Sequence, residues 1–354
     1  MKLSTAKHFL SCTAKPLVAF CLLLGICQSS IAEQSNPALQ PVRIGGSSTV
    51  HPMLERAIRE YRQAYPDETG SPIQLTEEGT SGGFRRFCQG QLLIAAASRP
   101  INSKEIQNCR AKRVQFIELP IAFDAITVVV NSHNTWAQLV TTRELARLWG
   151  RQAQGRINRW RLVNIDWPDR PLRLCAPGRD SGTYDMFNKA INGDPTNARQ
   201  DVIASEDDMT LVKCVASDVN AIGYFGYSYY YTNRDRLKAL SVVGPRGPVA
   251  PSAQTVQNES YRPLSRPLFL YVNDASLLQN EAGRRFLIWT LRHGLRISEE
   301  VGLITLPDST YRLAETKLYR RVLGSAFGGD MAVGAGVSET LRRSLESIKR
   351  PQFR

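Results

Sequence analysis

Three short segments of the sequence combine glycine with serine and threonine directly before a predicted helix. They are residues 46–49 (GSST), 79–83 (GTSGG) and 180–183 (DSGT). The start of a helix exposes unpaired backbone N–H groups and a partial positive charge, and glycine lets a ligand approach that backbone. Serine and threonine add neutral hydrogen-bond donors. If the three turns meet in space, they can bind a small oxyanion with few cations.

Each turn has an ordinary alternative role, since Ser, Thr and Asp are common helix N-caps. The second turn also fits the G-x-S-x-G pattern of a nucleophile elbow, which makes Ser81 the nucleophile of an alternative serine hydrolase. Such an enzyme needs a histidine base, for which His133 and His293 are the candidates. We interpret His133 as part of a polar turn and His293 as a helix end before Gly294. We therefore rank the hydrolase below a binding protein.

Strands and helices alternate around these turns, which predicts an α/β fold. Strands are expected at residues 41–44, 73–75, 92–96, 125–131, 172–176, 221–225 and 268–272. Helices are expected after each of the three turns, from about 208 to 216, and from 281 to 293. Two capping boxes, Asn102 with Glu105 and Thr141 with Glu144, start further helices, and the second ends at Gly150. Residues after about 324 lose clear periodicity.

The length and composition are those of an ordinary globular protein. With 354 residues, 42% of them hydrophobic and 22% charged, the chain is long enough for about two domains. The formal net charge of +13 suits an anionic partner without choosing among nucleic acid, a membrane surface and a small oxyanion. Because the basic residues are dispersed and no nucleic-acid-binding module is recognised, we expect no nucleic-acid partner.

The N-terminus has the pattern of a secretory signal peptide. Residues 1–16 carry three lysines and no acid, residues 17–27 form an uncharged apolar run, and residues 30–32 (SIA) suit cleavage before Glu33. We therefore expect residues 1–32 to be removed and the protein to be periplasmic. A lipoprotein would use Cys27, but the residue before it is bulkier than such sites favour.

Four cysteines remain after this cut: Cys88, Cys109, Cys175 and Cys214. An even number of cysteines in an exported chain predicts disulfides. Four cysteines allow three pairings, of which Cys88 with Cys109 and Cys175 with Cys214 are the local ones, each bracing one domain. No Cys-x-x-Cys pair is present and histidines are few, so we expect no metal site.

Several ordered motifs resemble one known family. They are residues 46–52 (GSSTVHP), 79–84 (GTSGGF), 86–88 (RFC), 97–101 (ASRPI), 126–131 (ITVVVN) and 177–184 (PGRDSGTY). From about Val42 to Leu323 the chain resembles the exported phosphate-binding proteins of the phosphate ABC transporter, the PstS family, and within it the SphX-like branch. This resemblance implies a type II periplasmic-binding-protein fold, in which two α/β lobes joined by two crossing strands enclose the ligand cleft. Lobe 1 would comprise residues 41–125 and 269–325, lobe 2 residues 126–268, and residues 326–354 would form a tail.

Carried over by motif, the resemblance implies phosphate-binding roles for the hydroxyl and glycine residues of the three turns. They are Ser48, Thr49, Thr80, Ser181, Gly182 and Thr183, with Ser81 as a further candidate. In this chain Arg99 stands where many members have an acidic residue, and Pro177 stands where they usually have an arginine. We therefore hypothesise that Arg99, helped by Arg179, pairs with the phosphate oxygens.

A carboxylate should then accept the proton of the bound phosphate. Asp180, Glu78 and Asp124 are the candidates, although each also has an ordinary structural role. Sulfate at neutral pH has no proton to donate, and an unsatisfied buried polar group costs about 1–3 kcal/mol, so this carboxylate would reject sulfate.

The resemblance implies a monomeric receptor that closes around inorganic phosphate and delivers it to a membrane permease. Such a protein is not an enzyme and needs no cofactor, because binding and lobe closure suffice for the task.

Overall fold

The structure is a computed structural model that describes residues 40–66, 72–244 and 247–349. The expected signal peptide at residues 1–32 and the alternative lipid site Cys27 lie outside the described residues. In the described part of the chain, no helix has the length and apolar character that a membrane span requires.

One mixed sheet runs through the molecule, with the strand order β2-β1-β3-β12-β4-β8-β6-β7, and β9 also pairs with β4. A smaller sheet has the order β11-β10-β5. The strands are β1 (Val42–Gly46), β2 (Ile73–Glu77), β3 (Ile94–Ala97), β4 (Phe116–Asn131), β5 (Leu139–Thr141), β6 (Arg173–Pro177), β7 (Ile203–Ser205), β8 (Ala221–Gly226), β9 (Leu237–Ala239), β10 (Ser241–Gly244), β11 (Gly247–Val249) and β12 (Ser265–Asn273).

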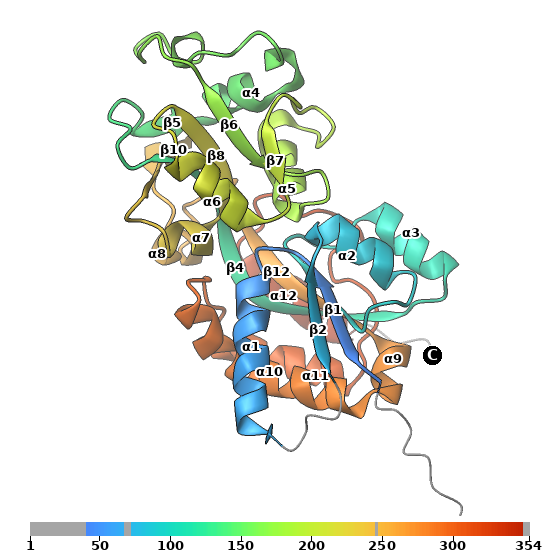
Figure 1. Cartoon of the computed structure of the whole chain (residues 1–354). Coiled ribbons are helices and arrows are strands. Elements are labelled where there is room, and N and C mark those ends of the chain that lie inside the picture. Colours follow the sequence, from blue (N-terminus) through green and yellow to red (C-terminus); the bar gives the residue numbers. More distant parts are fainter. Residues whose placement is uncertain (1–39, 67–71, 245–246, 350–354) are drawn as a thin grey trace, which may run out of the picture. The chain divides into compact units, whose positions relative to one another are not determined.

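The antiparallel strands β4 and β12 occupy the middle of the large sheet, and every residue of both is buried. The first half of β4 pairs with β12, and its second half pairs with β8 and β9. Figure 1 shows β4 and β12 passing from one group of elements to the other. We call these groups lobe 1 (β1–β3, α1–α3 and α9–α11) and lobe 2 (β5–β11 and α4–α8). The two long strands are the expected crossing strands.

The helices are α1 (His51–Ala64), α2 (Gly79–Phe87), α3 (Ser103–Ala111), α4 (Thr142–Trp149), α5 (Gly182–Asn192), α6 (Asp208–Ala216), α7 (Tyr227–Tyr231), α8 (Ala253–Gln257), α9 (Asp274–Gln279), α10 (Glu281–Glu300), α11 (Asp308–Tyr319) and α12 (Val337–Lys349). Both predicted capping boxes are confirmed, at the starts of α3 and α4. Apolar side chains that include Leu54, Leu119 and Phe286 form a core in lobe 1, and others that include Trp160 and Phe187 form one in lobe 2.

Two disulfides join Cys88 to Cys109 in lobe 1 and Cys175 to Cys214 in lobe 2. These are the local pairings among the three that the sequence allows, so that prediction is confirmed. The first links the end of α2 to α3, and the second links β6 to α6. Each therefore braces one lobe and leaves the two lobes free of a covalent link to each other at these cysteines.

The prediction that a helix ends before Gly294 is wrong, because α10 continues to Glu300. Gly294 serves close packing instead: a Cβ atom there would lie 2.6 Å from Cε1 of Tyr311 on α11. His293 consequently lies inside the helix, where its Nδ1 is 2.8 Å from the carbonyl oxygen of Trp289 and its ring stacks on that indole.

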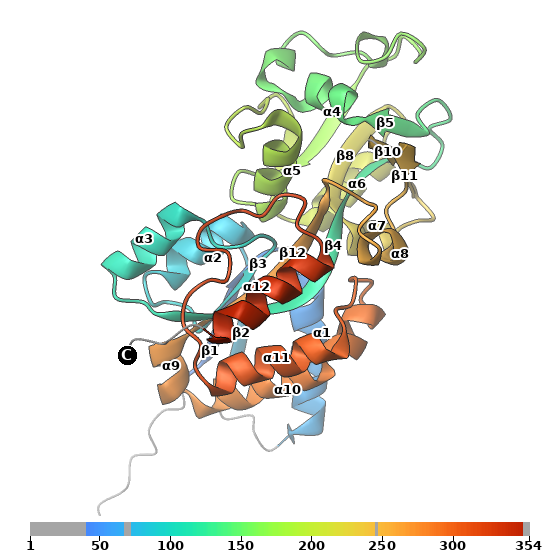
Figure 2. The same cartoon turned by 180° about the vertical axis from the view of Figure 1, so that it is seen from behind.

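The expected tail also differs, since α12 forms within it and packs against β4 and α11 (Figure 2). Before this helix, Ala326 and Phe327 are buried in an apolar cluster of lobe 1. The buried residues of α12 include Thr340 and Ser344, both without exposed surface. Because these residues are small and polar, a search for apolar periodicity does not detect the helix.

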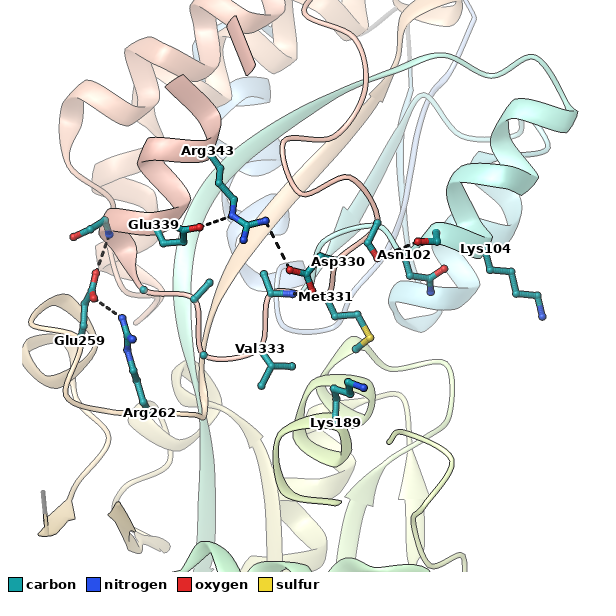
Figure 3. Close-up of a pocket in the computed structure, with 17 residues that line it drawn as sticks. Asn102, Lys104, Lys189, Glu259, Arg262, Asp330, Met331, Val333, Glu339 and Arg343 are labelled. Atoms are coloured by element: carbon teal, nitrogen blue, oxygen red, sulfur yellow. Dashed lines mark hydrogen bonds and ion pairs between the residues drawn. The ribbon is translucent and has the colours of Figure 1, made fainter. Parts of the chain in front are cut away.

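A cavity of about 1060 Å³ lies beside the C-terminal segment and is shown in Figure 3. Its lining comes from the starts of α3 and α12, from α5, and from the segments 259–262 and 329–336. The acids and bases at its wall are largely paired with one another, for example Arg343 with Glu339 and Asp330. None of the predicted ligand residues lines this cavity.

Candidate functional site

The three hydroxyl-rich turns meet between the lobes. The hydroxyl oxygens of Thr49 and Thr183 are 3.4 Å apart, and the backbone N–H of Ser81 donates to the carbonyl oxygen of Asp180 at 2.8 Å. A Cβ atom on Gly182 would lie 2.6 Å from the hydroxyl oxygens of both Thr80 and Ser98. Glycine is therefore required at residue 182, because any side chain would push the turns apart.

The starts of α2 and α5 lie at this meeting point. Helix α2 begins at Gly79, and α5 has Ser181 as its N-cap, with the Ser181 hydroxyl accepting from the N–H of Thr183 at 3.1 Å. Helix α1 begins at His51, one turn later than the hydroxyls of its loop. The predicted ligand residues Ser48, Thr49, Thr80, Ser181, Gly182 and Thr183 are all buried here.

A buried ion pair lies on the crossing strands beside these hydroxyls. Arg266 of β12 is the direct antiparallel partner of Asp124 of β4, and neither side chain has any exposed surface. Nε and Nη2 of Arg266 donate to Oδ2 of Asp124 at 3.0 and 2.7 Å. Oδ1 of Asp124 accepts from the N–H of Tyr227 at 2.8 Å. The pair is held rigidly where the two lobes join.

Arg266 also reaches one hydroxyl from each lobe. Its Nη2 is 3.1 Å from the hydroxyl oxygen of Thr49 and 2.9 Å from that of Thr183. Its Nη1 is buried and has no hydrogen-bond partner in the described part of the chain. A buried donor without a partner costs about 1–3 kcal/mol, more when it is charged. The two N–H groups of Nη1 are therefore suited to an anion bound among the hydroxyls.

Arg99 is equally buried, but its hydrogen bonds are complete. Nε donates to Asp185 at 2.8 Å, Nη1 donates to Glu105 and to the carbonyl oxygen of Pro100, and Nη2 donates to Glu105 and to the hydroxyl of Ser81. A guanidinium has five N–H donors, and these contacts use all of them. The two carboxylates also balance its charge, so Arg99 has no free donor for an anion in this structure.

The remaining charged candidates are engaged elsewhere. Asp180 accepts two hydrogen bonds from Arg85, both at 2.6 Å, and this interaction lowers the pKa of Asp180. Glu78 accepts from Arg86 at 2.9 Å, and Arg179 is exposed. Of the three carboxylates proposed as proton acceptors, Asp124 is the one bonded to the arginine that contacts Thr49 and Thr183.

A group of carboxyls lies between the lobes near Ser48, whose hydroxyl donates to Asp208 at 3.1 Å. Burial raises the pKa of Asp208 to about 8, that of Glu77 to about 7 and that of Glu206 to about 6. Glu77 belongs to lobe 1, whereas Asp208 and Glu206 belong to lobe 2. Protonation of these groups therefore favours the close approach of the two lobes.

The serine hydrolase has no support. The Ser81 hydroxyl contacts Asp185 at 3.4 Å and Arg99 at 2.8 Å, and none of the histidines in residues 40–66, 72–244 and 247–349 is hydrogen-bonded to it. Of the two candidate bases, His133 is bonded to Asn131 and His293 to the carbonyl oxygen of Trp289. A nucleophile without a histidine base lacks the arrangement that the G-x-S-x-G pattern would need.

Arg266 is not among the ligand residues predicted from the sequence. The strand expected at residues 268–272 begins three residues earlier, at Ser265, and therefore includes Arg266. A usable signal was nevertheless present, because Arg266 and Asp124 are each the single charge in an apolar stretch, 264–272 and 119–130. Charges in buried strands need partners, so two such strands with opposite charges predict a pair.

A family model and two known proteins are similar to this chain over most of its length. A family model described as a PBP superfamily domain matches residues 32–293. The Protein SphX of Synechocystis sp. is 41% identical over 322 residues, which cover 91% of this chain and 94% of that protein. The phosphate-binding protein PstS of Staphylococcus aureus is 33% identical over 294 residues, covering 82% of this chain and 86% of that protein.

A solved structure agrees with the fold. It is named as a phosphate ABC transporter substrate-binding protein of Clostridium perfringens with bound phosphate. The likeness has a TM-score of 0.64 at 25% identity and covers 75% of this chain and 100% of that one. The two-lobed α/β fold predicted from the sequence is thereby confirmed.

Proposed function

This chain belongs to the PBP superfamily, among the PstS- and SphX-type proteins, and we propose that it is an exported receptor for inorganic phosphate. It captures the anion in the cleft between its lobes and delivers it to the permease of a phosphate ABC transporter. Lobe 1 comprises residues 41–125 and 269–325, and lobe 2 comprises residues 126–268. The similarity of the relatives over most of both chains supports this proposal.

The unpaired Nη1 of Arg266 is the observation that carries the proposal. It is a buried cationic donor beside a hydroxyl from each lobe, and one oxyanion placed there would satisfy it. We therefore assign the cation of the site to Arg266 in place of Arg99. The other ligands are Ser48, Thr49, Thr80, Ser181, Gly182 and Thr183, through hydroxyl and backbone N–H groups.

Asp124 is the proposed acceptor for the proton of the bound phosphate. It is fully buried and bonded to Arg266, whereas Asp180 and Glu78 are paired with arginines of α2. Sulfate offers no proton, so it would leave its negative charge facing a buried carboxylate. This arrangement favours phosphate over sulfate.

The receptor acts without chemistry of its own. Ligand contacts from both lobes stabilise the closed form, which the permease then recognises. The energy of uptake is supplied by the transporter's ATPase, and the receptor is a periplasmic monomer that needs no cofactor or metal. Residues 1–32 are its cleavable signal peptide.

Isothermal titration of the ligand-stripped mature chain with phosphate and with sulfate tests this function. The proposal expects tight one-to-one binding of phosphate and no heat with sulfate at neutral pH. Absence of heat with phosphate would overturn it. An assay of the wild type and of Ser81→Ala with a simple ester tests the hydrolase alternative. A receptor cleaves no ester with or without Ser81, whereas a hydrolase cleaves the ester and loses this activity in Ser81→Ala.

A further inference from the structure

Arg99 forms hydrogen bonds with groups of both lobes. These bonds use all of its N–H donors, so none is free to bind an anion. Its Nη1 and Nη2 hold both oxygens of Glu105 on α3 of lobe 1, at 2.8 and 2.7 Å. Its Nε holds Asp185 on α5 of lobe 2, at 2.8 Å. Arg99 itself follows β3 in lobe 1, so its contact with Asp185 crosses the cleft.

The lobe 1 end of this group is rigid. Glu105 completes the capping box of α3, accepting from the N–H of Asn102 at 2.9 Å, and the Arg99 guanidinium lies 5.7 Å from the ring centre of Phe84. Arg99 is 1% exposed. A guanidinium fixed in this way cannot follow Asp185 if the lobes separate, so opening the cleft breaks the contact.

The lobe 2 end lies on the helix that presents ligand groups. Asp185 belongs to the first turn of α5, two residues after Thr183. Its carboxylate also accepts from the hydroxyl of Ser81 at 3.4 Å. When Arg99 holds Asp185, the start of α5 is held against the start of α2, which is the arrangement that a bound anion needs.

We propose that Arg99 and Asp185 form a clamp between the lobes that sets the closed fraction of the protein before phosphate binds. Through this fraction the clamp sets the phosphate affinity, since the apparent dissociation constant equals the intrinsic one divided by the competent fraction. Arg99 is thus a positioning residue rather than a ligand. The affinity part of the clamp rests on the proposed function, whereas the closure part does not.

A second contact crosses the cleft and provides a matched comparison. Arg85 of α2 pairs with Asp180 of lobe 2 at 2.6 Å, but the two side chains are 58% and 39% exposed, against 1% and 15% for Arg99 and Asp185. Exposed ion pairs contribute little because water and salt screen them. The clamp therefore predicts a large effect for the buried pair and a small effect for the exposed pair.

The test is the distance between two spin labels on the mature chain, measured without phosphate. Gln107 on α3 and Gln152 in lobe 2 are exposed positions for the labels. Asp185→Asn removes the charge with little change in shape. We expect this variant to lower the ratio of closed to open protein about tenfold. Arg85→Gln should change that ratio less than about threefold. An unchanged ratio in Asp185→Asn overturns the clamp.

Titration with inorganic phosphate then tests the link to affinity. The rise in the dissociation constant of Asp185→Asn should equal the fall in its closed fraction, and Arg99→Gln combined with Asp185→Asn should cost little more than Asp185→Asn alone. An affinity loss without any change in closure overturns the proposal. If the wild type binds no phosphate, the proposed function fails, while the spin-label distances still decide the closure part of the clamp.

Discussion

Arg99 and Arg266 are both buried arginines near the meeting point of the three turns, yet their hydrogen bonding differs. Arg99 gives all five of its donors to protein groups, among them two carboxylates. Arg266 is bonded to one carboxylate and two hydroxyls, and its Nη1 is unpartnered in the described residues. Burial and charge are the same for both arginines, so the number of free donors is what leads us to propose Arg266, and not Arg99, as the ligand-binding arginine.

The largest effect should follow the loss of the unpaired cation. Arg266→Gln removes two charge-assisted hydrogen bonds to phosphate, so we expect the affinity to fall at least about 100-fold in isothermal titration. Because this change leaves Asp124 buried without its partner, the double variant Arg266→Gln with Asp124→Asn is the control for folding. Near wild-type affinity in either variant would contradict the assignment.

Asp124→Asn tests the proton acceptor. The neutral amide oxygen accepts a hydrogen bond from phosphate less strongly than the carboxylate does, and it carries no negative charge to repel sulfate, so we expect phosphate affinity to fall about 30-fold and sulfate binding to become measurable. A competition experiment, in which sulfate is titrated into the phosphate-loaded variant and the wild type, measures this change in anion selectivity. Unaltered exclusion of sulfate would place the acceptor elsewhere.

Arg99→Gln should cost less, about tenfold in phosphate affinity, because it acts through lobe closure rather than through contact with the anion. Discrimination against sulfate should stay at the wild-type level. A thermal unfolding curve of the same variant checks that the buried carboxylates Glu105 and Asp185 have not unfolded the protein. A change in sulfate discrimination would count against the clamp and in favour of a ligand role.

The dependence on pH provides a further test. The raised pKa values of Glu77 (about 7) and Asp208 (about 8) mean that the closed state holds protons that an open or unfolded chain would release. The free energy of unfolding and the closed fraction should therefore both fall as the pH rises from 6 to 9 and these two carboxyls lose their protons. Spin-label distances measured without phosphate give the closed fraction free of any change in the protonation of phosphate itself. The variant Asp208→Asn should make the closed fraction depend less on pH.

Local features of the fold were predictable from the sequence. The capping boxes of α3 and α4 are three-residue patterns whose geometry follows from the helix itself. The two disulfides join cysteines that are near each other in the sequence. The turns at residues 46–49, 79–83 and 180–183 follow strands of one sheet, so a common α/β architecture brings them together.

Features that depend on distant partners were not predictable in this way. Gly294 is typical of a helix end in the sequence, whereas in the structure it allows Tyr311 to pack closely. The buried face of α12 includes Ser and Thr, so it lacks the apolar periodicity that predicts a helix. Arg99 looks like a ligand until its partners Glu105 and Asp185 are placed around it. Arg266 is separated from Asp124 by 142 positions, so the contact between them follows only from the pairing of β12 with β4.

A crystal structure of the mature protein grown with phosphate would show which arginine binds the anion. We expect a phosphate oxygen within hydrogen-bonding distance of Arg266 Nη1, beside the hydroxyls of Thr49 and Thr183, with Arg99 still bonded to Glu105 and Asp185. A phosphate bonded to Arg99, with Arg266 Nη1 turned toward another protein group, would contradict this expectation.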